Sequence, residues 1–203
     1  MTSVNPKVQS FKRNLIIESA QLLFNQHSYE TVTVEDIART AGFGKSTVYS
    51  FFASKEDILH TVIQSGFEYL SDEFKRITEA DMDAVEALKL LIPLQYSFFL
   101  EYNTLIFNYI QRCESGTIRS ERQEQIRQMA LQKTVHLTNL IQRGIAEGTF
   151  IAVDPQYLAW FVISLIKGVC SPSLMRGSES IDAEKDIALL WTVIFEGILT
   201  QHQ

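Results

Sequence analysis

The four residues Gly44-Lys45-Ser46-Thr47 bring together a glycine backbone, an ammonium group and two hydroxyls, which are groups that proteins use to bind phosphate. The same order ends the P-loop of nucleotide-binding proteins, but that loop also needs a glycine five residues before its Gly-Lys pair. Arg39 occupies this position. A P-loop also follows a strand, whereas residues 33–42 (TVEDIARTAG) place their apolar side chains at helical spacing. The phosphate of a molecule other than a nucleoside triphosphate is therefore the better candidate.

Three helices must hold these residues in place. The spacing of apolar residues predicts helices over 7–26, 33–40 and 44–50. Thr33 can cap the second helix, and Gly42 permits a left-handed turn after it. The second and third helices would then form a helix-turn-helix, a motif whose second helix enters the major groove of DNA.

A recognition helix over 44–50 would present its polar residues to DNA. Its N-terminal end and the hydroxyls of Thr47 and Tyr49 suit backbone phosphates, while Lys45 can reach guanine O6 or N7. A helical hairpin with surface Lys, Ser and Thr is also common in proteins that bind no DNA, so residue types alone leave both interpretations open. The expected DNA-facing residues are Thr33, Val34, Lys45, Ser46, Thr47, Tyr49, Ser50 and Lys55.

One longer pattern goes beyond these residue types. Its members are Ala20, Leu23, Phe24, Tyr29, Thr31, Thr33, Asp36, Ile37, Ala38, Ala41, Gly42, Thr47, Tyr49, Phe52, Lys55, Glu56 and Leu59. In order and spacing this pattern closely resembles the DNA-binding region of the TetR/AcrR family of bacterial transcriptional regulators. The chain departs from the family at Ser28, where glycine is usual, and at residues 44–46, where a Ser-Lys-Gly run is frequent. The second departure alters base preference, so no operator sequence transfers from relatives.

The resemblance implies an all-α fold of about nine helices, with a helix-turn-helix domain over 1–53 and a ligand-binding and dimerisation domain over 54–203. Family members are homodimers whose two reading heads enter successive major grooves of a palindromic operator in double-stranded DNA. Most are repressors that a small-molecule effector releases from DNA. The resemblance also implies a bacterial cytoplasmic protein that associates with the nucleoid when it binds DNA.

The distribution of charge agrees with two parts that have different partners. The chain carries a net charge of −6, which by itself does not indicate a nucleic-acid-binding protein. Residues 1–60 are neutral overall, so residues 61–203 carry all of the negative charge. Cys113 and Cys170 are expected to be free thiols, and the spacing of cysteine and histidine suggests neither a metal site nor a cofactor.

Six further helices are predicted, and no sheet is expected. Pro93 lies inside one of them and should kink it, which could open a cavity beside the helix. The apolar run over 157–170 contains Lys167 and is shorter than the roughly 20 residues that cross a membrane, so no membrane partner is expected. The predicted ranges are 54–78, 83–100, 103–114, 118–147, 154–171 and 182–200.

The last two predicted helices, 154–171 and 182–200, are apolar on more than one face. Because a surface helix of a monomer needs only one buried stripe, the second stripe favours packing against a second copy of the chain. The alternative is a larger core within one chain. The residues expected at the dimer interface are Trp160, Ser164, Gly168, Ile187, Trp191 and Ile194.

The middle helices are rich in aromatic residues, which suits either an ordinary core or a pocket for an apolar or aromatic effector. For each aromatic residue taken singly, the core is the more common role. No dominant positive cluster occurs in this part of the sequence, so a strongly anionic effector has no obvious counter-ion. The expected ligand-binding residues are Gln95, Tyr96, Phe99, Tyr102, Phe107, Tyr109 and His136.

The sequence therefore predicts a ligand-responsive, dimeric DNA-binding regulator that acts as a repressor. One alternative is an activator, or a regulator of the same fold that answers to a protein partner. Another is a helical small-molecule-binding protein without DNA binding, although Thr47, Tyr49 and Lys55 are all present. No motif or pairing of residues that is typical of an enzyme occurs, so catalysis is not expected.

Overall fold

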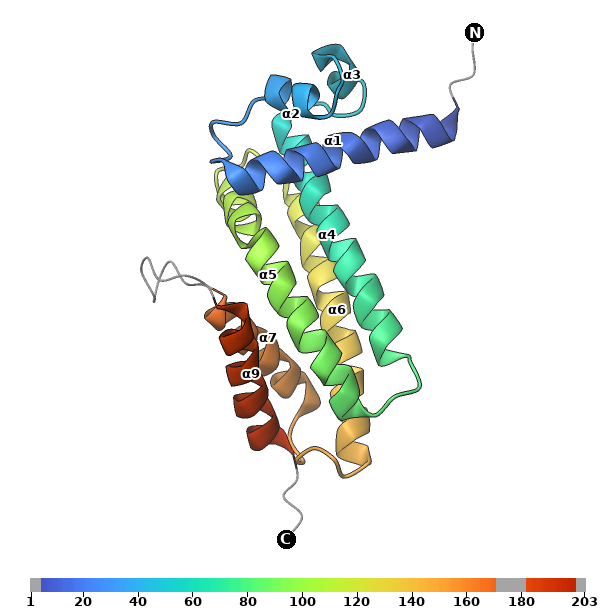
Figure 1. Ribbon diagram of the computed structural model, residues 1–203, viewed down its shortest axis with the longest axis vertical. Helices are drawn as coiled ribbons and strands as arrows, with labels where there is room; N and C mark the ends of the chain where they lie inside the picture. Colours follow the sequence, from blue (N-terminus) through green and yellow to red (C-terminus); the bar gives the residue numbers. More distant parts are fainter. Residues whose placement is uncertain (1–4, 171–181, 200–203) are drawn as a thin grey trace. The chain divides into compact units, whose positions relative to one another are not determined.

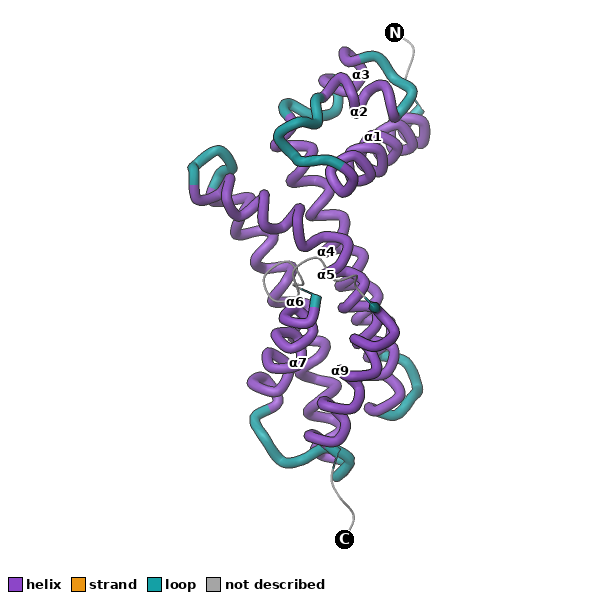
Figure 2. The backbone as a smooth tube through the Cα atoms, turned by 60° about the vertical axis from the view of Figure 1, so that its left-hand side comes forward, coloured by secondary structure: helices purple, strands orange, loops and turns teal. Residues whose placement is uncertain are grey.

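The computed structural model describes residues 5–170 and 182–199, and these residues form helices joined by short turns. Figures 1 and 2 show no strand in the described ranges; a single antiparallel bridge joins Phe150 to Leu199. The helices are α1 (Pro6–Gln26), α2 (Val34–Thr40), α3 (Lys45–Tyr49), α4 (Lys55–Thr78), α5 (Ala84–Glu114), α6 (Ser120–Ala146), α7 (Pro155–Val169) and α9 (Ala183–Ile198). The all-α prediction is confirmed.

The predicted helix boundaries agree with the observed ones to within about two residues, apart from one false break. The ranges 83–100 and 103–114 form a single helix, α5, which continues through Pro93. Residues 94–114 contain neither glycine nor proline, so nothing in that segment stops a helix that has passed the proline. The predicted ends at residues 171 and 200 lie outside the described residues.

Side-chain caps fix the starts of several helices where the sequence predicts them. Thr33 and Asp36 form a reciprocal capping box at the start of α2. Ser54 accepts a hydrogen bond from the backbone N–H of Asp57 at the start of α4. Asp154 accepts two backbone N–H groups at the start of α7, which has proline as its first residue. These local interactions explain why the boundaries are readable from sequence.

The chain divides into two compact units that are interleaved in sequence. Unit 1 comprises Met1–Gly66 and Thr104–Ile126, and unit 2 comprises Phe67–Asn103 and Arg127–Gln203. Helices α4, α5 and α6 each contribute one segment to either unit. The predicted domain boundary between residues 53 and 54 cuts the chain once. The two units instead group segments that pack together although they are separated in sequence.

Unit 1 is a helical core in which α2 and α3 lie beside α1 (Figure 1). Polar contacts join the unit's segments of α4, α5 and α6 to each other: Arg122 donates to Asp57 at 2.6 Å, and the Tyr109 hydroxyl lies 2.9 Å from His60 Nδ1. The buried apolar residues of this unit include Ile16, Ala20, Phe24, Ile37, Val48, Phe52, Ile58 and Leu59.

Unit 2 packs the remaining segments of α4, α5 and α6 with α7 and α9, which lie side by side in Figures 1 and 2. A buried hydrogen bond of 2.8 Å from the Tyr96 hydroxyl to Asp186 joins α5 to α9. At the end of α6, the backbone carbonyl of Gly144 accepts hydrogen bonds from the N–H groups of Thr149 and Phe150. The Phe150 ring is buried directly against Gly144.

The absence of a side chain at position 144 is a packing requirement of unit 2. A Cβ at this position would overlap the Phe150 ring and lie 3.1 Å from Ala84 Cβ. We therefore expect Gly144→Ala to lower the free energy of unfolding by about 1–3 kcal/mol, as overpacking of a core does. Urea denaturation at a fixed protein concentration measures this change.

Gly197→Ala is the matched control, because Gly197 is also helical and a Cβ there would meet nothing within 4 Å. This variant should keep the stability or raise it by up to about 1 kcal/mol, since alanine favours a helix over glycine. Equal effects of the two substitutions would contradict a steric role for Gly144.

Candidate nucleic-acid interface

The turn between α2 and α3 is built around Gly42, whose φ is +76°. Only glycine adopts this left-handed conformation without strain, and it allows the N–H of Phe43 to donate to Ala38 O at 2.8 Å. Gly44 then begins α3 in an extended conformation. The helix-turn-helix geometry that the sequence predicts is therefore set by hydrogen bonds of the backbone itself.

Burial of one face of α3 leaves its other face free. Val48 is fully buried in the core that also contains Ile37 and Ala38 of α2. The side chains of Lys45, Ser46 and the following polar residues consequently point out of the core. Those of Lys45, Ser46, Tyr49 and Ser50 are exposed, and that of Thr47 is half-buried.

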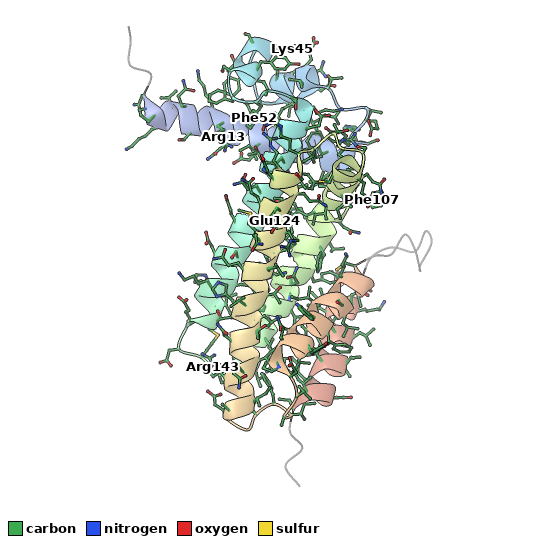
Figure 3. The ribbon with its side chains drawn as sticks, turned by 180° about the vertical axis from the view of Figure 1, so that it is seen from behind. Arg13, Lys45, Phe52, Phe107, Glu124 and Arg143 are labelled. Carbon is green, nitrogen blue, oxygen red and sulfur yellow. The ribbon has the colours of Figure 1, made fainter. Side chains whose placement is uncertain are left out.

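Figure 3 shows Lys45 at the periphery of unit 1. Its ammonium lies 3.9 Å from Glu35, and both side chains are more than half exposed, so solvent weakens this pair. Tyr49 is 49% exposed, an unusual state for an aromatic residue next to a core. Lys45 and Tyr49 are thus available to a partner of unit 1.

Thr33 and Val34, at the start of α2, have structural roles within unit 1. The Thr33 hydroxyl donates to Asp36 at 2.6 Å and accepts the Asp36 backbone N–H, and the hydrogen bonds from Thr33 lower the pKa of the Asp36 carboxyl. Thr33 is exposed but already serves as a cap. Val34 is only 9% exposed, because it shares the apolar face of α2 with Ile37. The expectation that the Val34 side chain faces DNA is therefore not supported.

Lys55 lies inside the fold of unit 1. Its ammonium donates to the carbonyl oxygens of Tyr29 and Val32, each at 2.8 Å, and stands 4.3 Å from the centroid of the Tyr29 ring. Burial lowers the pKa of this amine. These contacts tie the first turn of α4 to the loop between α1 and α2, so we leave Lys55 out of the proposed DNA-contacting set.

Arg112 reinforces the same loop, which sequence reasoning missed. The side chain of Arg112 is only 16% exposed. Its guanidinium carbon lies 3.9 Å from the Tyr29 ring centroid, and the guanidinium donates to Glu30 at 2.6 Å. Burial raises the pKa of Tyr29 to about 12, and its hydroxyl donates to Glu56. Only tertiary contact reveals this cluster.

Basic residues of α1 also lie near the helix-turn-helix. Arg13 stands 5.4 Å from the ring centroid of Phe52, which Figure 3 shows as neighbours. Lys12 stands 5.9 Å from the Phe43 ring. Sequence reasoning did not select either residue, although a lysine-arginine pair one turn before the buried stripe of α1 is a visible signal.

The predicted effector residues are divided between the two units. Gln95, Tyr96, Phe99, Tyr102 and His136 belong to unit 2, whereas Phe107 and Tyr109 belong to unit 1.

Several of these side chains have other surroundings. Phe107 is 61% exposed (Figure 3). Tyr109 is buried against His60, and Tyr102 stacks on Phe98 with the ring centroids 4.7 Å apart. In these cases, the abundance of aromatic residues in the sequence did not show what covers each ring.

The predicted interface residues on α7 and α9 separate into two groups. Trp160, Ser164, Gly168 and Trp191 are exposed, and Ile187 is half-buried. Ile194 is 1% exposed within its own chain but lines the apolar groove of this surface, so its contact with a partner stays a prediction. An apolar groove of about 510 Å³ lies along this surface. Its lining includes Tyr157, Phe161, Val193 and Gly197.

The described residues contain neither a metal-binding cluster nor a helix that could cross a membrane. Residues 5–170 and 182–199 hold no group of three or more His, Cys, Asp or Glu side chains placed to bind a metal ion. Within the same ranges, every helix is too short or too polar to cross a membrane.

The environments of Lys45 and Lys55 predict that substitution lowers the stability at Lys55 but not at Lys45. Lys55→Met should lower the free energy of unfolding by about 1–3 kcal/mol, because the Tyr29 and Val32 carbonyl oxygens lose a buried donor. Lys45→Met should leave the melting temperature unchanged, since its side chain is exposed. Thermal and urea unfolding of both variants measure this contrast, and a Lys55→Met variant as stable as the wild type would refute the structural role.

Comparison with known proteins agrees with this geometry. Residues 16–62 match the model of the bacterial regulatory proteins of the tetR family. The chain is 24% identical over 154 residues to the uncharacterized HTH-type transcriptional regulator YhgD of Bacillus subtilis, covering 76% of this chain and 80% of that protein. It is 24% identical over 140 residues to the HTH-type transcriptional repressor KstR2 of Mycobacterium tuberculosis, covering 68% and 69%.

Solved structures have the same fold. A transcriptional regulator of the TetR/AcrR family from Thermobifida fusca superimposes with a TM-score of 0.75 at 23% identity, covering 91% of this chain and 97% of that one. KstR2 itself superimposes with a TM-score of 0.69 at 20% identity, with 98% of each chain covered. The helix-turn-helix of α2 and α3 therefore lies inside the segment that matches the tetR family of bacterial regulatory proteins, and the chain has the fold of solved TetR/AcrR regulators.

Proposed function

We propose that this protein is a dimeric transcriptional repressor that binds a palindromic DNA operator and is released by a small apolar or aromatic effector. The observation that carries the proposal is the polar, exposed face of α3, which is held against a rigid core by Val48 on its opposite side. A helix in this position presents its side chains to the major groove.

Within this proposal, the residues of α3 divide into two kinds of contact. Lys45 lies at the first position of α3 and reaches base edges, where a lysine pairs with guanine O6 or N7. The hydroxyls of Thr47 and Tyr49 donate to backbone phosphates, which set the register of the protein on the duplex. Ser46 and Ser50 flank these residues on the exposed surface.

The dimer is supported by the apolar surface of α7 and α9. Tyr157, Trp160 and Phe161 are 70%, 43% and 57% exposed, and Leu189 and Val193 of α9 are 52% and 45% exposed. A continuous apolar surface of this kind is rare on a soluble monomer and marks an interaction site. Two copies related by a two-fold axis would each bury the same surface.

Effector release is supported by the names of relatives. KstR2 is described as a ketosteroid transcriptional regulator and repressor, and another structure with the same fold, SmeT, as the repressor of a multidrug efflux pump. We propose that an effector in unit 2 favours a dimer whose reading heads no longer match the spacing of about 34 Å between successive major grooves. A coupling of about 1–3 kcal/mol would weaken operator binding by about 5- to 150-fold.

We further propose that the protein acts in the bacterial cytoplasm and catalyses no reaction. An activator of the same fold remains the alternative for the sign of regulation. Transcription from an operator-bearing template, with and without the protein, distinguishes these two possibilities directly.

Selection from a random pool of duplex DNA tests the DNA interface. The wild type should enrich a palindromic sequence, and Lys45→Ala and Tyr49→Ala should each weaken binding by about 1–3 kcal/mol, the usual value of one good contact. The slope of log K against log salt falls by about 0.9 for each cationic phosphate contact that is lost, so Tyr49→Ala, which removes a neutral hydroxyl, should leave this slope nearly unchanged.

Lys89→Ala is the control for charge, because Lys89 is an exposed lysine on α5 in unit 2. It should bind the selected sequence as the wild type does. Failure to enrich any sequence at any salt concentration would contradict the proposal that the protein binds DNA.

A charged substitution on α7 tests the dimer. Trp160→Glu should convert the dimer to a monomer at micromolar concentration, because a carboxylate would be buried without a partner in the interface. Sedimentation equilibrium measures the mass. Tyr69→Glu, at a site on α4 that is 61% exposed, should remain dimeric. A dimer that persists in Trp160→Glu would place the interface elsewhere.

A further inference from the structure

Unit 2 contains a buried lysine that sequence analysis did not select. Lys133 of α6 is only 4% exposed, and its ammonium donates to Gln95 Oε1 of α5. Burial lowers the pKa of this amine to about 7. Among the described residues it has no carboxylate partner, whereas buried charges in proteins are usually paired. The sequence argument considered only a cluster of positive residues and a strongly anionic effector, so it did not address this single buried lysine.

The partner of Lys133 is itself incompletely bonded. An ammonium group only donates hydrogen bonds, so the atom of Gln95 that faces it must be Oε1. The Nε2 of Gln95 is then a second donor, and it is buried with no hydrogen-bond partner among the described residues. Gln95 is 1% exposed. The pair thus offers N–H groups from both residues while its one side-chain acceptor, Oε1, is already used.

Apolar side chains surround these donors. The ammonium of Lys133 stands 5.4 Å from the ring centroid of Phe74 and 6.0 Å from that of Phe99, distances at which cation–π attraction only partly replaces hydration. Gln95 and Phe74 also line a small pocket of unit 2. Its other walls come from α5, α6 and α7 and are Leu88, Leu91, Ile92, Leu137, Val162, Ile163 and Ile166.

We propose that Lys133 and Gln95 bind the carboxylate of a small apolar acid whose aliphatic or aromatic body enters this pocket. This inference rests on the proposed function, because it specifies the chemical class of the effector. A carboxylate is an anion with two acceptor oxygens, so one group compensates the charge of Lys133 and accepts the free N–H of Gln95.

Other head groups fit less well. A phosphate monoester carries more charge and more acceptors than one lysine and one amide can satisfy in an apolar site. An amine would place a third donor against two donors. A neutral alcohol can accept these hydrogen bonds but leaves the ammonium without a counter-ion.

The size of the pocket links binding to a change of shape. The enclosed space measures about 10 Å³, which is close to the volume that one water molecule needs. The body of the acid therefore enters only by displacing the walls, which belong to α4, α5, α6 and α7. Displacement of these helices is how an effector in unit 2 would bias the conformation of the chain.

Isothermal titration calorimetry of the full-length protein, without DNA, tests the site. The probes are octanoate, decanoate and 4-phenylbutanoate, each compared with the alcohol of the same carbon skeleton. We expect one carboxylate per chain to bind at least about tenfold more tightly than its alcohol, since a hydrogen bond to a charged group is roughly twice as strong as a neutral one.

Three variants separate charge from shape. Lys133→Met should weaken binding of the carboxylate at least about tenfold and leave binding of the alcohol nearly unchanged. Gln95→Leu should weaken the carboxylate by a smaller factor. Lys89→Met, which removes an exposed lysine of α5, should bind both probes as the wild type does.

Melting temperatures show whether Lys133 is instead a structural residue. Lys133→Met removes a buried charge but leaves Gln95 Oε1 without its donor, so the test is the double variant Lys133→Met/Gln95→Leu, which removes both groups and should melt at the same temperature as the wild type or higher. A large loss of stability, an equal loss of both probes or no binding of any carboxylate would overturn the proposal.

Operator binding distinguishes this site from the proposed function. If the operator is bound and no carboxylate is, the head-group site is wrong while the regulator stands. If a carboxylate binds through Lys133 and operator affinity does not change, the site stands and release by this effector class is wrong.

Discussion

The burial of Val48 is the constraint on which the DNA-reading surface depends. α3 has only five residues, which is too short for a helix to be stable in water without tertiary contacts. Packing of Val48 into the core of α1 and α2 supplies that stability and fixes which side chains remain outside. Lys55 and Arg112 then secure the preceding loop through Tyr29. Burial of Val48 therefore leaves the polar face of α3 exposed.

Three lysines show that environment, and not residue type, decides a role. Lys45 is exposed and loosely paired, so its ammonium is available to a partner. Lys55 donates hydrogen bonds to backbone carbonyl oxygens and so stabilises the loop between α1 and α2. Lys133 is buried against aromatic rings with an amide as its acceptor. The same charge therefore stabilises the fold at Lys55 and, as we propose, serves DNA recognition at Lys45 and effector binding at Lys133.

Helix positions and the helix-turn-helix were predictable because their signals are local. The capping box of Thr33 and the turn at Gly42 each involve residues only a few positions apart. Pairs such as Arg112–Glu30 and Tyr96–Asp186 join residues 82 and 90 positions apart, and no periodicity encodes them. Periodicity placed Ile194 among the expected interface residues, but it could not show that this side chain is largely buried within its own chain.

Buried polar groups in unit 2 indicate where stability and function diverge. Leucine or methionine in place of Lys133 and Gln95 would satisfy the apolar pocket without an unpaired charge or an unbonded amide. A core selected for stability alone therefore has no need of this pair, and local departures from good packing rules concentrate at functional sites. A ligand that neutralises the pair removes a cost that the free protein carries. Binding energy of this origin is available to displace the surrounding helices, which is the property that an effector site requires.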